Sequence, residues 1–244
     1  MPNNQLQKIV LTIPMNKILI IVPAYNEEES LQGVIQDLRS HVPDADILVV
    51  DDGSSDGTAV VARQSGVNLV RLSFNLGIGG AMQTGFQYAR TKGYDIAIQF
   101  DGDGQHLAAE IDILLATLNK GTADIVIGSR FLNRGDYRPS FFRKIGISIF
   151  STVLSAIIGI RVTDTTSGFR AANRRVIEFF ARVYPEDYPE VESLVLLHRA
   201  GMSMKEAPVH MRDRTGGRSS ITPIRSAYYM IKVLLAVFID LLKK

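Results

Sequence analysis

Short apolar runs alternate with amphipathic stretches through the first half of this 244-residue chain. The apolar runs are rich in Ile, Val and Leu on both faces, as buried parallel strands are. The predicted strands are Lys17–Val22, Asp46–Val50, Val67–Leu72, Asp95–Phe100 and Ala123–Ile127. The predicted helices are Glu28–Ser40, Thr58–Gln64, Gly79–Lys92 and Leu107–Asn119. This alternation predicts an α/β fold built on a doubly wound, mostly parallel sheet.

Turn formers and polar residues follow every predicted strand. In chain order these segments are 23–28, 51–58, 75–80, 101–106 and 128–130. Ligands of doubly wound sheets bind beyond the carboxyl ends of the strands. We therefore expect the five segments to converge on one rim that forms a binding site.

The triplet Asp101-x-Asp103 is the clearest chemical signal on that rim. Two carboxylates one residue apart at a strand end can reach the same hard cation, and Mg²⁺ is commonly held by one or two carboxylates plus substrate phosphates. Gln105 can add an oxygen and His106 an imidazole. We predict a site for Mg²⁺ or Mn²⁺ at Asp101, Asp103 and Gln105; an acidic turn without a ligand is the alternative.

Two further segments on the rim are suited to a nucleotide. Asp52 can accept hydrogen bonds from a base or a ribose, whereas Asp56 is predicted to cap the next helix. The glycine-rich segment that begins at Gly77 either presents backbone N–H groups to a phosphate or serves the backbone conformation alone. Neither a GxGxxG sequence after the first strand nor a Walker A sequence is present.

The second half of the chain carries two long apolar segments. Residues 145–160 are uncharged but shorter than the roughly 20 residues of a membrane span. Residues 222–242 begin with Thr222-Pro223, a favourable helix start, and have one apolar face. We predict that both helices lie in a membrane interface. Burial in the core or in a dimer contact is the alternative.

The two halves of the chain also differ in net charge. The first 129 residues hold 8 Lys/Arg and 15 Asp/Glu, and the rest hold 19 and 10, for a net charge of +2. An acidic front half suits a metal, and a basic back half suits phosphates or a lipid surface. There are no cysteines, which excludes disulfides and thiolate metal sites, and Met1 to Gln7 show no signal-peptide pattern.

The motifs on the rim resemble the nucleotide-binding half of family 2 inverting glycosyltransferases, which have the GT-A fold. These motifs are Val22-Pro23-Ala24-Tyr25-Asn26-Glu27-Glu28, Asp51-Asp52-Gly53-Ser54-Ser55-Asp56-Gly57-Thr58, Asn75-x-Gly77-x-Gly79-x-Ala81 and Asp101-x-Asp103-x-Gln105-His106. Later segments resemble the polyprenyl-phosphate branch, whose best-known member is dolichyl-phosphate mannose synthase. These are Gly128-Ser129-Arg130, Arg143, Asp164-Thr165-Thr166-Ser167-Gly168-Phe169-Arg170 and Arg214-x-x-Gly217-x-Ser219.

The resemblance implies a domain organisation. Residues 15–225 form one GT-A domain, with a Rossmann-like nucleotide-sugar-binding half at 15–130. The acceptor half at 131–225 contains an interfacial helix at 143–160. A C-terminal amphipathic helix at 222–244 associates with a membrane.

The resemblance also implies site residues. Nucleotide-binding residues are Pro23, Tyr25, Glu27, Asp52, Gly77 and Asp101. Catalytic residues are Asp103, Arg130, Arg143 and Arg214, of which the arginines bind phosphates. A loop that closes over the donor contains Arg212, Gly217, Arg218 and Ser219. Synthases of this branch often carry Lys after the loop serine, but this chain has Ser220 at that position. Either Arg218 supplies the missing positive charge, or the loop binds its ligand differently.

The acceptor decides whether a base is needed. A lipid phosphate is already anionic, so its attack requires none, whereas a sugar hydroxyl requires a carboxylate base. Glu190 and Glu192, at the start of a predicted helix, are candidates for that base or are ordinary helix-start acids.

These observations favour transfer of a sugar, with inversion, from a UDP- or GDP-sugar to a polyprenyl phosphate, by a protein peripheral to the cytoplasmic face of a membrane. A sugar hydroxyl of a polysaccharide or glycolipid is the alternative acceptor. A non-catalytic scaffold fits less well with the acidic residues on the rim. A nucleotidyltransferase fits less well with the residues at the end of the first predicted strand. We expect a small membrane-anchoring protein or a second copy of the chain as partner, and no nucleic acid.

Overall fold

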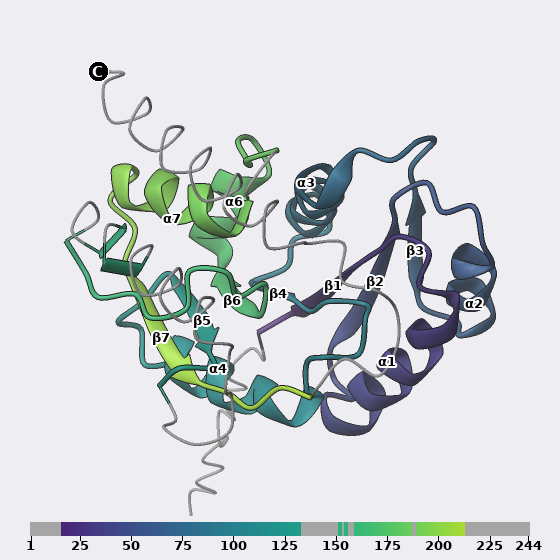
Figure 1. The fold of residues 1–244 in the computed structure, drawn as a ribbon, viewed down its shortest axis with the longest axis horizontal. Helices are drawn as coiled ribbons and strands as arrows, with labels where there is room; N and C mark the ends of the chain where they lie inside the picture. Colours follow the sequence, from purple (N-terminus) through teal and green to yellow (C-terminus); the bar gives the residue numbers. More distant parts are fainter. Residues whose placement is uncertain (1–15, 133–150, 153, 156–158, 187–188, 213–244) are drawn as a thin grey trace, which may run out of the picture.

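A seven-stranded sheet carries helices on both of its faces (Figure 1). The computed structural model describes residues 16–132, 151–152, 154–155, 159–186 and 189–212. The strands are β1 (Ile18–Ala24), β2 (Asp46–Asp51), β3 (Asn68–Arg71), β4 (Ile96–Gln99), β5 (Ile125–Ser129), β6 (Arg170–Asn173) and β7 (Met204–Pro208). The helices are α1 (Glu28–His41), α2 (Thr58–Gln64), α3 (Gly77–Thr91), η1 (Ala108–Glu110), α4 (Ile111–Leu118), α6 (Arg174–Phe180) and α7 (Pro189–Arg199).

The predicted α/β fold with a mostly parallel sheet is confirmed. All five predicted strands form, as do the four predicted helices, with their ends displaced by at most two residues. The fourth helix opens with a short 3₁₀ turn, η1, before α4. The hydrophobic pattern therefore located these elements correctly.

The sheet order is β3-β2-β1-β4-β6-β5-β7, which the hydrophobic pattern did not predict. β6 is antiparallel and lies between β4 and β5, so β4 and β5 do not pair with each other. β7 then pairs in parallel with β5. Because β6 is antiparallel to both flanking strands, β4 and β5 still run in the same direction, and their carboxyl ends reach the same edge.

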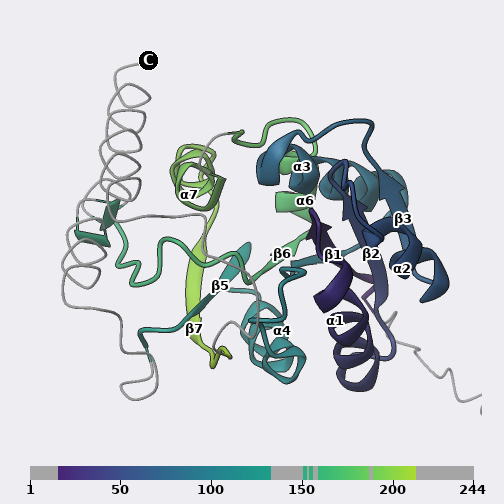
Figure 2. The ribbon, with the colours of Figure 1, turned by 45° about the vertical axis from the view of Figure 1, so that its right-hand side comes forward.

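The apolar character of both strand faces follows from the two layers of helices. In β1, Leu19 and Ile21 pack on one face with α3 and α6, while Ile20 and Val22 pack on the other with α1 and α4. All four side chains are fully buried. Figure 2 shows α3 and α6 on one side of the sheet and α1 and α4 on the other.

Most of the two predicted interface helices lies outside the described residues. Residues 151, 152, 154 and 155 are helical. Leu154 is buried in the core beside α3 and α6, and Ser151 and Ser155 donate hydrogen bonds to the backbone oxygen of Val162. This part of the 143–160 segment thus packs on the protein itself. The 222–244 segment lies wholly beyond the described part of the chain.

Candidate functional site

A pocket of about 280 Å³ opens at the carboxyl edge of the sheet. It is lined by all six residues predicted to bind a nucleotide, Pro23, Tyr25, Glu27, Asp52, Gly77 and Asp101, and by Asp103. These residues come from the ends of β1, β2 and β4 and from the start of α3. The tertiary structure therefore joins four of the five predicted segments in one cavity.

Hydrogen bonds between neighbouring strand ends hold the walls of this pocket. Asn26 has a positive φ of 56° and donates its backbone N–H to Ser54 Oγ at 2.9 Å. In return, Asn26 Oδ1 accepts from the N–H of Ser55 at 2.9 Å. Asp56 Oδ1 accepts from the N–H of Thr58, the first residue of α2, at 3.0 Å, but the N-cap residue of α2 is Gly57 and Asp56 stands one position before it.

Asp52 is buried and fixes the start of α3. Its Oδ1 accepts a hydrogen bond from the N–H of Leu76 at 2.7 Å. Burial raises the pKa of Asp52, although the backbone bonds from Leu76 and Gly77 partly oppose the rise. At the start of α3, the N–H of Leu76 is thus bonded to Asp52, and the N–H of Gly77 donates to Asn75 Oδ1 at 3.0 Å.

The glycine-rich segment is the first turn of α3 and not a loop before it. The helix begins at Gly77, two residues earlier than predicted. A Cβ on Gly79 would lie 2.3 Å from the backbone oxygen of Pro185, so this glycine is required by packing against the segment before α7. For Gly79 the requirement is close packing, which neither sequence-based interpretation included.

Asp101 is held by a buried histidine. His106 Nε2 lies 3.0 Å from Asp101 Oδ2, and the imidazole stacks on Phe169 with 4.8 Å between ring centroids. Burial alone would raise the pKa of Asp101. The charge and hydrogen bond of His106, the bond from Gln99 and the charge of Arg130 outweigh burial and lower this pKa below its usual value. About a third of the Asp101 side chain remains exposed to the pocket.

Asp103 and Gln105 continue the same turn. Asp103 Oδ1 accepts the backbone N–H of Gln105 at 3.0 Å, and the backbone oxygen of Gln105 accepts the N–H of Arg212 at 2.8 Å. Arg212 Nη1 lies 3.5 Å from Asp37 Oδ2 on α1. The predicted donor loop therefore starts beside the acidic turn, while Gly217, Arg218 and Ser219 lie outside the described residues, as do Arg143 and Arg214.

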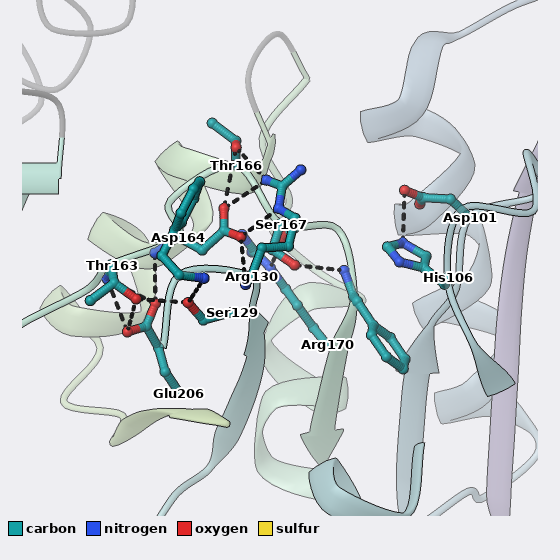
Figure 3. A network of polar contacts seen from close by, with 12 residues as sticks. Asp101, His106, Ser129, Arg130, Thr163, Asp164, Thr166, Ser167, Arg170 and Glu206 are labelled. Atoms are coloured by element: carbon teal, nitrogen blue, oxygen red, sulfur yellow. Dashed lines mark hydrogen bonds and ion pairs between the residues drawn. The ribbon is translucent and has the colours of Figure 1, made fainter. Parts of the chain in front are cut away.

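A glycine brings the segment 164–170 against the acidic turn. A Cβ on Gly168 would lie 3.0 Å from both carboxylate oxygens of Asp101 and 3.0 Å from Gln99 Nε2. On the other side of this segment, Asp164 is fully buried and accepts from Arg130 Nε at 2.7 Å and Nη2 at 2.8 Å (Figure 3). The segment thus connects Arg130, at the end of β5, with Asp101, at the end of β4.

Arg170 connects β6 to the start of α7. Its buried guanidinium donates to the backbone oxygens of Ser167 at 2.8 Å and Glu190 at 2.6 Å, and to Ser193 Oγ at 2.7 Å. Burial raises the pKa of the Glu190 carboxyl, and the charge of Asp101 adds to the rise while that of Arg170 opposes it. Glu190 is therefore within electrostatic reach of the acidic turn.

Comparison with known proteins agrees with this geometry. Residues 19–180 match the family described as Glycosyl transferase family 2. The chain is 31% identical over 230 residues to a polyprenol monophosphomannose synthase of Mycolicibacterium smegmatis, which covers 90% of this chain and 86% of that protein. The chain belongs to glycosyl transferase family 2. It is also 33% identical over 216 residues to an undecaprenyl-phosphate mannosyltransferase of Micrococcus luteus, with coverage of 84% and 88%.

Solved structures support the fold of this family 2 glycosyltransferase. Glucosyl-3-phosphoglycerate synthase from Mycobacterium tuberculosis, in complex with Mn²⁺, uridine diphosphate and phosphoglyceric acid, superposes with a TM-score of 0.68 at 18% identity. The match covers 92% of this chain and 78% of that one. The GT-A fold is thereby confirmed, and the relatives place the chain in the polyprenyl-phosphate branch.

The acidic turn fits a divalent cation shared with a substrate. Within the described ranges, no Lys or Arg forms an ion pair with Asp101 or Asp103, and no group of three or more His, Cys, Asp or Glu could hold a metal ion alone. A cage made only of protein ligands is therefore not built there. A cation bound by one or two carboxylates plus phosphate oxygens is the arrangement these residues suit.

Glu206 and Thr163 belong to the same polar network and were not predicted. Glu206 on β7 accepts hydrogen bonds from Thr163 and Asp164 (Figure 3). Burial raises the pKa of Glu206, the bonds from Asp164 and Thr163 oppose the rise, and the charge of Asp164 adds to it. Neither residue stands in a motif or beside a predicted strand end, so only the pairing of β7 with β5 reveals them.

A larger depression, of about 410 Å³, lies at the opposite edge of the sheet. Its acidic residues are paired within the chain. Asp124 accepts hydrogen bonds from Ser203 and Asn173 and lies 3.2 Å from Arg175, and Asp95 lies 3.5 Å from Arg174. We therefore place the functional site in the smaller pocket. None of the described helices has the length and apolarity to cross a membrane.

Proposed function

We propose that this glycosyltransferase moves a sugar, with inversion, from a UDP- or GDP-sugar to a polyprenyl phosphate with the help of Mg²⁺ or Mn²⁺. The observation that carries the proposal is the shared pocket of Asp52, Asp101 and Asp103, with Arg130 held at the next parallel strand end. The relatives support the acceptor, since their names specify polyprenol or undecaprenyl phosphate mannosylation. The solved neighbour with uridine diphosphate and Mn²⁺ supports the donor class and the metal.

Each part of the pocket has a task in this proposal. Tyr25, half exposed on the wall, and Asp52 bind the base and ribose. Asp101 and Asp103 would hold the cation, which would supply positive charge to the diphosphate, and the start of α3 adds backbone N–H groups. Arg130, together with Arg143 and Arg214, binds phosphate groups of the donor or the acceptor.

The reaction needs no general base when the acceptor is a phosphate. One phosphate oxygen, already anionic near neutral pH, attacks the anomeric carbon as the bond to the nucleoside diphosphate breaks. A bound divalent cation supplies positive charge for the departing diphosphate. The ionised state of Asp101, favoured by His106 and Arg130, suits a cation ligand.

Sugar transfer from a labelled donor tests the proposal. The purified chain is incubated with Mg²⁺ or Mn²⁺, radiolabelled UDP- and GDP-sugars, and undecaprenyl or dolichyl phosphate in detergent. We expect a labelled lipid that is cleaved by mild acid and absent when the metal is chelated. The unphosphorylated polyprenol serves as the matched control. A labelled product from the alcohol and none from the phosphate contradicts the proposed acceptor.

A sugar hydroxyl is the second candidate acceptor, and Glu190 favours it. Its raised pKa and its place beside Arg170 suit a general base. Under this alternative, Glu190→Gln abolishes transfer, whereas Glu192→Gln, in the same helical turn, leaves it intact. With a phosphate acceptor, Glu190→Gln retains most of the activity.

We also propose that the protein is peripheral to the cytoplasmic face of a membrane, where its lipid acceptor resides. The predicted amphipathic helix at 222–244 and the basic second half support this location, and a small membrane protein or a second copy serves as partner. Flotation with liposomes tests the association. Binding to anionic and not to neutral vesicles is expected from the basic second half, and failure to float with either contradicts it.

A further inference from the structure

Glu206 holds the backbone that precedes Asp164. Its Oε1 accepts from the N–H groups of Thr163 and Asp164, each at 2.8 Å. Its Oε2 accepts from the N–H of Thr163 at 2.9 Å and from Thr163 Oγ1 at 2.8 Å. Thr163 Oγ1 also contacts Ser129 Oγ, at the end of β5, at 2.7 Å. A carboxylate bonded to two successive peptide groups fixes both their position and their orientation.

Asp164 in turn holds Arg130. The fully buried carboxylate accepts from the backbone N–H of Arg130 at 3.1 Å and from Nε and Nη2 at 2.7 and 2.8 Å. The Nη2 group also donates to Thr166 Oγ1 at 2.9 Å. Two parallel bonds from one guanidinium to one carboxylate set the plane of the guanidinium. The direction in which Arg130 faces the site thus depends on where the backbone of Asp164 lies.

We propose that Glu206 is a positioning residue for Arg130: it acts through the peptide groups of Thr163 and Asp164 and sets the orientation of the guanidinium toward the departing diphosphate or the accepting phosphate. This inference rests on the proposed function for the identity of the phosphate. The coupling between Glu206 and Arg130 rests on the contacts alone. Glu206 lies on β7, outside the pocket lining, so its effect on turnover passes through the network drawn in Figure 3.

A comparable carboxylate at the other edge of the sheet provides the control. Asp124 accepts hydrogen bonds from the backbone N–H and Oγ of Ser203 and from Asn173 Nδ2. It also forms an ion pair with Arg175, whose side chain is 55% exposed. It fastens a strand to its neighbours as Glu206 does, but it has no contact with the pocket. A purely structural role for Glu206 predicts the same kinetic outcome for both carboxylates.

A double-mutant cycle tests the proposal. Glu206→Ala is expected to lower kcat by about tenfold to a hundredfold, because a misplacement of about 1 Å can cost about a hundredfold. Arg130→Lys keeps the charge but loses the two parallel bonds, so Glu206→Ala should lower kcat by less than about twofold further in that background. If the fold-losses in kcat of the two single variants multiply in the double variant, the two residues act independently and the proposal is overturned.

Two variants separate positioning from stability. Glu206→Gln keeps one carbonyl oxygen for both N–H groups and is expected to restore kcat to within about threefold of wild type, a loss of less than 1 kcal/mol by the usual conversion. Asp124→Ala is expected to lower the denaturation midpoint as Glu206→Ala does while kcat stays unchanged. If Asp124→Ala lowers kcat as much as Glu206→Ala at a matched loss of stability, the positioning role is wrong.

The test also distinguishes failure of the proposed acceptor. The cycle is measured with whichever acceptor wild type uses, and calorimetry with Mn²⁺ and UDP or GDP gives a second cycle that needs no acceptor. In that second cycle, Glu206→Ala should weaken nucleotide binding in wild type but not in Arg130→Lys. A wild-type enzyme that uses only a sugar hydroxyl as acceptor overturns the proposed function. Coupling between Glu206 and Arg130 in either cycle still supports the positioning role of Glu206. Additive effects in both cycles overturn that role.

Discussion

The two edges of the sheet both carry carboxylates, but they use them differently. At the amino edge, Asp95 and Asp124 lie within 3.5 Å of Arg174 and Arg175. At the carboxyl edge, Asp52, Asp101 and Asp103 line a pocket, and no ion pair joins them to a Lys or Arg in the part of the chain that the structure describes.

At the amino edge the charge of each carboxylate is balanced by an arginine of the same chain, so these pairs stabilise the fold without requiring a ligand. Asp101 and Asp103 have no Lys or Arg ion pair within the described residues, and although His106 favours the ionised form of Asp101, a divalent cation would reduce the repulsion between the two carboxylates. The comparison therefore supports our proposal that the smaller pocket is the functional site. It also predicts that the same kind of substitution will change activity at one edge and stability at the other.

Asp103→Ala provides the largest expected contrast. Loss of one of two cation-binding carboxylates should lower transfer by about a thousandfold, because the cation contributes several kcal/mol to the transition state. The folded state should keep its denaturation midpoint. Asp95→Ala, at the amino edge, should transfer sugar at the wild-type rate. Activity that survives an excess of metal chelator would show that the metal assignment is wrong.

Gly168→Ala tests how closely the carboxyl edge is packed. The new methyl group would lie 3.0 Å from both oxygens of Asp101 and displace that carboxylate by a few tenths of an ångström. Activity at saturating metal is expected to fall about tenfold, since catalytic groups tolerate little displacement, and the Mn²⁺ concentration for half-maximal activity should rise. Titration of activity with Mn²⁺ measures both. An unchanged Mn²⁺ requirement would mean that Asp101 does not bind the cation.

Asp124→Asn should affect stability alone. It weakens hydrogen bonds to Ser203 and the ion pair with Arg175, at a cost of about 1–2 kcal/mol in the free energy of unfolding at pH 7. Burial would raise the pKa of Asp124, but its bonds and the charge of Arg175 lower it overall. Urea denaturation measures the loss, and transfer activity at pH 7 should be unchanged.

The pH dependence of that loss has a definite sign. A carboxylate whose pKa is lowered by folding stabilises the protein above its unfolded pKa, about 3.9, and this contribution disappears as the pH falls through the folded value. The difference between wild type and Asp124→Asn should therefore shrink from pH 5 toward pH 2. A difference that stays constant over this range would mean that Asp124 is not stabilised in its ionised form.

Gly33→Ala is the smallest expected effect and lies at neither edge. The position is in α1, with nothing within 4 Å of an added Cβ. Alanine should raise the free energy of unfolding by about 0.5–1 kcal/mol, because glycine is a poorer helix former. Sugar transfer should stay at the wild-type rate. A loss of transfer would indicate that α1 moves during the reaction.

The first half of the chain was predictable because its signals are local. A strand buried on both faces must be apolar throughout, so β1, β2 and β4 are visible as runs of Ile, Val and Leu. Parallel strands end at one edge, so the polar segments after them had to meet there. The pocket containing Asp52, Asp101 and Asp103 follows from these two facts.

The second half required the tertiary structure because its strands are short and carry charges. β6 contains Arg170 and β7 contains Lys205 and Glu206, so neither has an apolar run. Their partners lie far away along the chain, and Glu206 contacts Thr163 across 43 residues. No local pattern encodes such a contact.

The sequence by itself determined the sheet-forming half, the acidic turn and the edge at which they meet. Only the tertiary structure decided that β6 enters between β4 and β5 and that β7 brings Glu206 to the segment holding Arg130. The physical reason is that hydrophobic periodicity reports burial of each segment. The position of a buried polar group is set by which distant donors and acceptors can satisfy it.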